Sequence, residues 1–120
     1  MRGMRIEREL MRGVGPMAVL KLLEEQEMYG YELVEALRRK TDGVLEMGES
    51  TLYPLLYNLE SKKLIRGTWR QIESGRRRKY YSLTKKGEAR LLSHRKQWDR
   101  LMGVMRELGF VRPASEIDDQ

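Results

Sequence analysis

The sequence predicts a mainly α-helical fold that contains one small β-hairpin and ends in a long helix. Three segments between residues 16 and 62 repeat apolar residues with the spacing of an α-helix. Residues 64–84 instead alternate with the period of two that is typical of strands, and residues 85–108 return to helical spacing. The chain has 120 residues, of which 40% are hydrophobic, so a single domain with a modest core is expected.

The first core helix is expected over residues 16–26. Pro16 suits a first helical position, and Met17, Leu20 and Leu23 follow it. Residues 1–12 are polar and basic, and they fit either a short helix or a flexible arm.

Two further helices are expected before the hairpin. Residues 31–40 follow Gly30 and end in basic residues, which suit the negative end of the helix dipole. Residues 50–62 carry leucines at the spacing of one helical face, namely Leu52, Leu55, Leu56 and Leu59. Pro54 is tolerated only in a first turn, so this third helix should begin close to Ser50 or Thr51.

The hairpin is expected to pair residues 64–72 with residues 78–84. The polar segment 73–77, which contains Gly75, forms the turn between them. Thr84 then suits the N-cap of a last helix over residues 85–108. That helix carries a stripe with strict three- and four-residue spacing, formed by Leu91, His94, Trp98, Leu101, Met105 and Leu108.

Positive charge is concentrated in the hairpin. The chain carries a net charge of +6. Residues 66–79 hold six basic residues against Glu73 alone, a net charge of +5, whereas residues 111–120 carry a net charge of −2. A local excess of this kind favours a polyanionic partner, and nucleic acid before a membrane.

The order helix, helix, helix, hairpin, helix is that of a winged helix-turn-helix followed by one extra helix. In such a domain the third helix enters the major groove of double-stranded DNA, and the basic tip of the hairpin reaches phosphates or the minor groove. The predicted DNA-binding residues are Tyr31, Ser50, Thr51, Tyr53, Tyr57, Asn58, Arg76, Arg77, Arg78 and Lys79. Two alternatives stay open: the arginines form a solvated loop, or Tyr53 and Tyr57 pack beneath the hairpin.

Other classes of protein lack support in the sequence. There is no cysteine, one histidine, no phosphate-binding glycine loop and no metal-ligand cluster, so neither an enzyme nor a metal or cofactor site is predicted. No apolar run is long enough for a membrane span, and the N-terminus has no signal-peptide core, so we expect a cytoplasmic protein. The alternative function is a winged helix that binds another protein and has no operator.

Three motifs make the sequence resemble the PadR family of transcriptional regulators, in its short form with one extra helix. They are MYGYEL at 28–33, ESTLYPLLYNLESKKLI at 49–65 and ESGRRRKYYSLTKKGEARL at 73–91. The resemblance covers about residues 13–108. Tyr29 stands at the family's usual histidine, Lys63 at its usual glycine, and Gln26-Glu27 at its usual Gly-Pro. Gly15-Pro16 falls where the family's first helix is apolar, so that helix starts later or bends.

The resemblance implies a homodimer that binds a near-palindromic operator and represses until a ligand or signal releases it. The apolar stripe supports a dimer independently, because the winged domain can cover only part of the last helix. The predicted dimer contacts are Leu91, Trp98, Leu101, Met105 and Leu108. Trp98 is also the candidate contact for an aromatic effector, with Asp99 or Glu107 supplying negative charge, although packing alone explains a tryptophan there.

These expectations divide the chain into four parts. Residues 1–12 form an arm or short helix, residues 13–84 the DNA-binding domain, residues 85–108 the dimerisation helix, and residues 109–120 a flexible acidic tail. His94 is expected to be a structural residue of the stripe rather than a pH switch.

Overall fold

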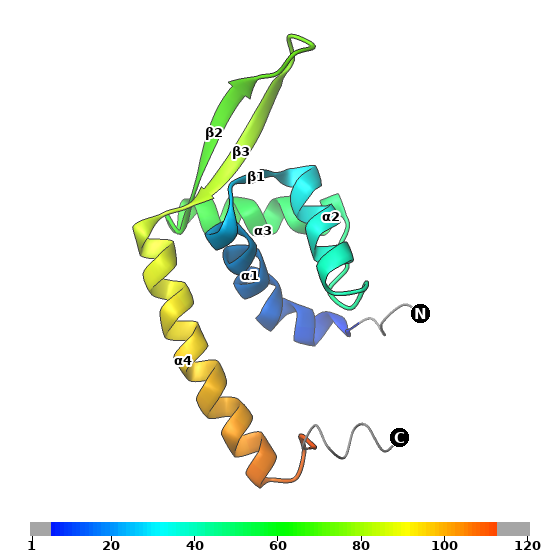
Figure 1. Cartoon of the computed structure of the whole chain (residues 1–120), viewed down its shortest axis with the longest axis vertical. Helices are drawn as coiled ribbons and strands as arrows, with labels where there is room; N and C mark the ends of the chain where they lie inside the picture. The colour runs from blue at the N-terminus through cyan, green and yellow to red at the C-terminus, as the bar shows by residue number, and fades with distance from the viewer. Residues whose placement is uncertain (1–5, 113–120) are drawn as a thin grey trace.

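The computed structural model describes residues 6–112, which form four helices and one three-stranded antiparallel sheet. In chain order the elements are α1 (Arg8–Glu25), β1 (Met28–Tyr29), α2 (Gly30–Lys40), α3 (Glu49–Ser61), β2 (Ile65–Gln71), β3 (Arg77–Leu83) and α4 (Lys85–Glu107). The β2–β3 hairpin extends from one end of the helical body, and α4 starts beside the base of the hairpin and runs along the side of the body in the opposite direction (Figure 1). The predicted mainly α fold with a hairpin and a long last helix is confirmed.

The first helix begins earlier than predicted. α1 starts at Arg8 and continues through Gly13 and Gly15, so Pro16 lies inside it rather than at its first position. Proline has no N–H to donate to the carbonyl of Arg12 and its ring crowds that carbonyl, which favours a bend. Figure 1 shows α1 changing direction along its length. Met11 and Met17, before and after the proline in the chain, both pack against the core. These tertiary contacts outweigh the weak helix propensity of the segment.

A short strand that the sequence pattern did not predict joins the hairpin to the helical body. Met28 and Tyr29 of β1 pair with Tyr81 and Tyr80 of β3, so the sheet order is β1-β3-β2. The backbone N–H of Tyr29 donates a hydrogen bond to the Glu32 carboxylate, 3.1 Å away, at the start of α2. Two residues are too few to show an alternating pattern, so only the tertiary pairing reveals this strand.

Three helices end in the same hydrogen-bonded cap, in which the residue after the C-cap is left-handed. Gly109 has this conformation after α4, with φ of 77°, and glycine adopts it at little cost. After α3 the position is taken by Lys63, with φ of 64°. The N–H groups of Lys63 and Leu64 donate to the carbonyls of Glu60 and Leu59, at 2.9 and 3.0 Å. Asp42 has the corresponding place after α2.

The core lies where α1, α2 and α3 meet the base of the hairpin. Its largest fully buried side chains are Val19, Leu20, Leu33, Leu37, Leu52, Leu56, Leu64 and Ile65. α3 begins at Glu49, so Pro54 lies in its second turn rather than its first. The hydrogen bond lost at Pro54 would have ended at the carbonyl of Ser50, an exposed residue where water can replace it. Within residues 6–112, no helix combines the length and apolar character needed to cross a bilayer.

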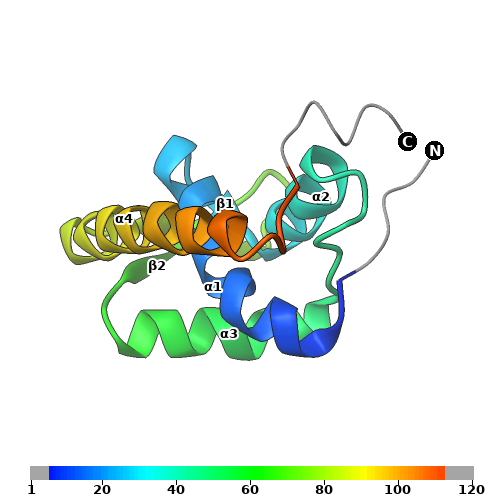
Figure 2. The same ribbon diagram turned by 90° about the horizontal axis from the view of Figure 1, so that it is seen from below.

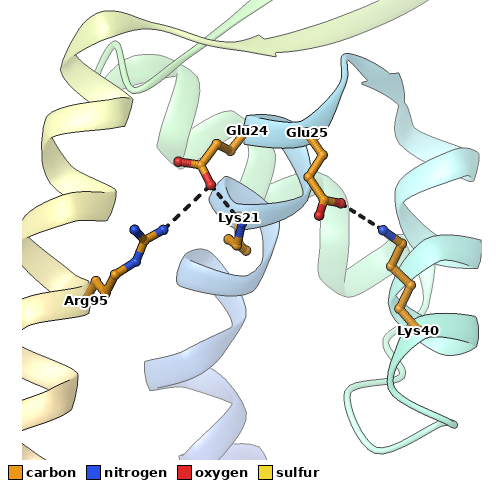
Figure 3. A network of polar contacts seen from close by, with 5 residues as sticks. All are labelled: Lys21, Glu24, Glu25, Lys40 and Arg95. Atoms are coloured by element: carbon orange, nitrogen blue, oxygen red, sulfur yellow. Dashed lines mark hydrogen bonds and ion pairs between the residues drawn. The ribbon is translucent and has the colours of Figure 1, made fainter.

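Thr84 fixes the start of α4, as predicted. Its hydroxyl accepts a hydrogen bond from the Gly87 N–H at 3.0 Å, and it lies 2.7 Å from the Lys63 carbonyl. Ion pairs of Glu24 in α1 connect it to its own helix and to α4 (Figure 3). Glu24 lies 2.7 Å from Lys21 and 3.7 Å from Arg95 of α4.

Candidate nucleic-acid interface

α3 lies along one edge of the molecule and has one exposed face (Figure 2). The side chains predicted to read DNA from helices are all exposed: Tyr31, Ser50, Thr51, Tyr53, Tyr57 and Asn58. At about 100° per residue, Ser50 and Tyr57 point in nearly the same direction, away from the buried Leu52 and Leu56. Tyr57 is 76% exposed. Ser50 and Tyr57 therefore lie at the centre of this face.

Thr51 and Asn58 lie on one flank of that face. They line a groove of about 470 Å³ between α1 and α3, together with apolar side chains that include Met11, Pro16 and Leu55. This flank is turned toward α1, so Thr51 and Asn58 are less central to the exposed face of α3 than Ser50 and Tyr57.

Tyr53 lies on the other flank and packs against the start of α2. A side-chain carbon added to Gly30 would overlap the hydroxyl and ring of Tyr53. The glycine of the MYGYEL motif and the tyrosine of the third helix therefore form one close contact that sets how α2 and α3 meet. Tyr53 thus has a packing role, against α2, in addition to its exposed surface.

The cations of the hairpin do not form a single cluster at its tip. The turn covers residues 72–76, where the N–H of Gly75 donates to the Ile72 carbonyl at 2.9 Å. Arg76 and Arg77 are exposed beside this turn. Arg78 and Lys79 are half-buried further down β3, so of the expected Arg76-Arg77-Arg78 tip only Arg76 and Arg77 lie exposed beside the turn. Because successive strand residues point to opposite faces, the four cations are divided between the two faces of the hairpin.

Aromatic rings on each face hold these cations. On one face the Arg78 guanidinium lies 4.0 Å from the ring centre of Tyr29, which contacts Tyr80 edge to face. On the other, Arg77 lies 5.4 Å and Lys79 5.9 Å from the ring centre of Trp69. Cations over ring faces are attracted by the electron-rich surface of the ring.

Two carboxylates from outside the hairpin complete the arrangement. Glu27, between α1 and β1, binds Arg70 through both carboxylate oxygens, with N–O distances of 2.6 and 2.7 Å. Glu60 of α3 accepts a hydrogen bond from the Lys79 ammonium at 2.9 Å, which raises the pKa of Lys79.

The sequence reasoning missed both carboxylates and the roles of Tyr29 and Trp69. The predicted register of the hairpin could have revealed Trp69, because it pairs directly with Lys79. Glu27 and Glu60 gave no local signal, since each lies far along the chain from its partner.

The stripe of α4 is divided between the core and the surface. Leu91 is 3% exposed and belongs to the core, so the prediction that it contacts a partner is wrong. Trp98, Leu101 and Leu108 are 41%, 47% and 73% exposed, and Met105 is half-buried. Val104, which the strict spacing omitted, is also exposed. His94 is half-buried.

Among the described residues, no three histidine, aspartate or glutamate side chains are grouped so as to hold a metal ion. The predicted acidic tail falls mostly on residues 113–120, outside the part that the structure describes.

Comparison with known proteins identifies relatives over nearly the whole chain. A transcriptional regulator from Clostridium thermocellum is 31% identical, with a TM-score of 0.78 over 89% of this chain and 99% of its own. A Streptococcus transcriptional regulator is 40% identical, with a TM-score of 0.74 over 86% of this chain and 99% of its own. A PadR-like transcriptional regulator from Bacillus cereus is 31% identical, with a TM-score of 0.74 over 87% and 99%.

Sequence comparison leads to the same group. An uncharacterized protein from Lysinibacillus sphaericus is 31% identical over 100 residues, which is 83% of this chain and 92% of that protein. The sequence model of the transcriptional regulator PadR-like family matches residues 19–93, the segment from α1 into α4. Members of that family are regulators, which confirms that the chain is not an enzyme. This chain belongs to the PadR-like family of transcriptional regulators.

Proposed function

We propose that the chain is a homodimeric, sequence-specific DNA-binding repressor that a small ligand releases. The observation that carries this proposal is the exposed face of α3 beside a hairpin whose segment 66–79 holds a net charge of +5. A polar helix face can read base edges in the major groove, and cations beside it can bind phosphates. Since the DNA lies in the cytoplasm of a bacterial-type cell, we propose that the protein acts there.

Within this surface, we assign base reading chiefly to Ser50 and Tyr57. Their hydroxyls are at the centre of the exposed face of α3, and a hydroxyl can both donate to and accept from base edges. Tyr31, Thr51, Tyr53 and Asn58 surround that centre. Arg76 and Arg77 are assigned to phosphates, because they are the exposed cations at the hairpin turn.

The dimer is proposed from the second half of α4. This half of α4 extends from the body (Figure 1). Its exposed Leu101, Val104 and Leu108 follow helical spacing and form an apolar strip. Soluble monomers seldom keep such a strip, and a two-fold axis that pairs it with its copy is the commonest way to bury it. The same symmetry would present two copies of α3 to an inverted repeat.

Release by a ligand is proposed at the same strip. Trp98 is partly exposed there, so in a dimer its ring could stack on an aromatic effector. Asp99, the next residue, or Glu107, more than two turns further along α4, would favour a cation. A test is the quenching of Trp98 fluorescence by planar cations, measured in a Trp69→Phe background that leaves Trp98 as the single tryptophan. Quenching without any change in DNA affinity would contradict the regulatory role.

DNA binding is tested by selecting bound fragments from genomic DNA and titrating the selected duplex against a random one. Ser50→Ala and Tyr57→Phe should weaken binding to the selected duplex more than to random DNA. A double variant, Arg76→Ala with Arg77→Ala, should weaken both alike, because phosphate contacts carry little sequence information. If about six phosphates are neutralised, affinity should fall about a thousandfold between about 50 and 200 mM salt.

The competing function, binding to another protein, predicts different results. No sequence would be enriched by selection, and binding to DNA would be weak. A salt response that is flat over the same range would reject the DNA-binding proposal.

The dimer is tested by placing two glutamates in the strip, with Leu101→Glu and Met105→Glu. The double variant should sediment as a monomer or unfold, and it should lose affinity for the selected duplex. The control matched in charge is Ala89→Glu with Lys96→Gln, on the opposite side of α4, which should stay dimeric. A folded monomer for the unaltered protein at micromolar concentration would show that the dimer proposal is wrong.

A further inference from the structure

The cations of the hairpin differ in whether they are free to meet a phosphate. Arg66, Arg76 and Arg77 are exposed, and among the described residues no carboxylate forms an ion pair with them. Arg70 and Lys79 are instead paired with Glu27 and Glu60.

The pairing of Arg70 is well matched in geometry. Both carboxylate oxygens of Glu27 meet guanidinium nitrogens, at 2.6 and 2.7 Å, the parallel arrangement that a phosphate would also adopt. The other side of the guanidinium faces the Tyr80 ring, 4.7 Å from its centre. A phosphate that approached Arg70 would therefore have to displace Glu27 or remain beside its negative charge.

Lys79 is held in a comparable way on the opposite face of the hairpin. Its ammonium lies 2.9 Å from a Glu60 oxygen and 5.4 Å from the ring centre of Tyr81. The pair is less exposed than the others, with side chains 27% and 32% exposed, so its charge is partly shielded from water. Lys79 also reaches across Gly67, where an added side chain would overlap it.

These ion pairs are expected to contribute little to the folding stability of the protein. Exposed ion pairs typically contribute only about 0–1 kcal/mol to folding. Their effect on DNA binding is expected to be larger, because each cation that meets a phosphate releases a counterion and steepens the dependence of affinity on salt.

We infer that Glu27 and Glu60 withhold Arg70 and Lys79 from DNA phosphates, and so limit how tightly the hairpin binds DNA of any sequence. This inference rests on the proposed function. Its consequence is that the phosphate affinity of the hairpin is set by two acidic residues outside it, one before β1 and one in α3. Weaker phosphate contacts leave a larger share of the discrimination between sequences to α3.

The test uses a double-variant cycle on a random-sequence duplex, with affinity measured at several salt concentrations. Glu27→Gln should free Arg70 and steepen the slope of log affinity against log salt by about 0.9 per hairpin, or about 1.8 per dimer. Glu27→Gln combined with Arg70→Gln restores the original net charge and should restore the original slope. Glu60→Gln and its combination with Lys79→Gln form the second cycle.

The matched control is Glu24→Gln, which removes the same charge from a pair between α1 and α4 and should leave the slope unchanged. A steep slope for the unaltered protein that Glu27→Gln and Glu60→Gln do not change would overturn this inference and leave the proposed function intact. The inference also fails if Glu24→Gln steepens the slope as much, since net charge would then be the cause. A flat slope for the unaltered protein overturns the proposed function and the inference together.

Discussion

Gly87, in the first turn of α4, should not tolerate even one added methyl group. A side-chain carbon at this position would overlap the backbone carbonyl oxygen of Leu64 and lie 2.6 Å from a methyl group of Leu83. That carbonyl also accepts a hydrogen bond from the Thr84 N–H at 3.2 Å. Gly87→Ala must therefore move the backbone at Leu64, between α3 and β2, or the first turn of α4.

The expected size follows from two opposing effects. Crowding a well-packed site costs about 1–3 kcal/mol, and alanine regains about 0.5–1 kcal/mol over glycine within a helix. The free energy of unfolding should therefore fall by up to about 2.5 kcal/mol. Gly103→Ala, in the same helix, has no described atom within 4 Å of the added carbon, so it should raise that free energy by about 0.5–1 kcal/mol. On the helix, Gly103 points about 160° away from Leu101 and about 100° away from Val104, so its added methyl group lies off the proposed dimer strip.

Urea denaturation of both variants at one fixed protein concentration measures the difference, since dimerisation contributes to apparent stability. The urea concentrations at the unfolding midpoint should move in opposite directions for the two variants. The slope of the free energy of unfolding against urea concentration should stay the same. If Gly87→Ala is as stable as Gly103→Ala, the close approach between α4 and Leu64 does not exist in solution, and the reasoning fails.

Three further predictions concern stability. Lys63→Gly should raise the free energy of unfolding by about 0.5–1 kcal/mol in urea denaturation, because glycine relieves the left-handed strain; a loss would contradict this. Gly30→Ala should lower it by about 1–3 kcal/mol, and adding Tyr53→Ala should cost less than the sum of the two single changes; strict additivity would mean that the two residues do not touch. The hydrogen bond from Lys21 lowers the pKa of Glu24 below its usual value of 4.5, so Glu24 contributes stability above that pH and loses it as pH falls through its folded pKa. The stability difference between the unaltered protein and Glu24→Gln should therefore vanish on acidification, and a difference that persists at pH about 2 would refute this.

The extent of each element was predictable where the signal is local. The four-leucine spacing and a basic hairpin with a glycine turn place α3 and the hairpin within a residue or two. α1 was misjudged because Gly13, Gly15 and Pro16 disfavour a helix locally, while contacts of Met11 and Met17 with the core support one.

The candidate site also combines features that local sequence patterns predicted with features that depend on contacts between distant segments. Side-chain periodicity and composition predicted which residues of α3 are exposed and how much charge the hairpin carries, because both depend only on neighbouring residues. The burial of Leu91, the packing of Tyr53 on α2 and the pairing of Arg70 instead depend on how distant segments fold together. Glu27 is 43 residues from Arg70 along the chain, and a contact over that separation forms only when folding brings β1 beside the hairpin.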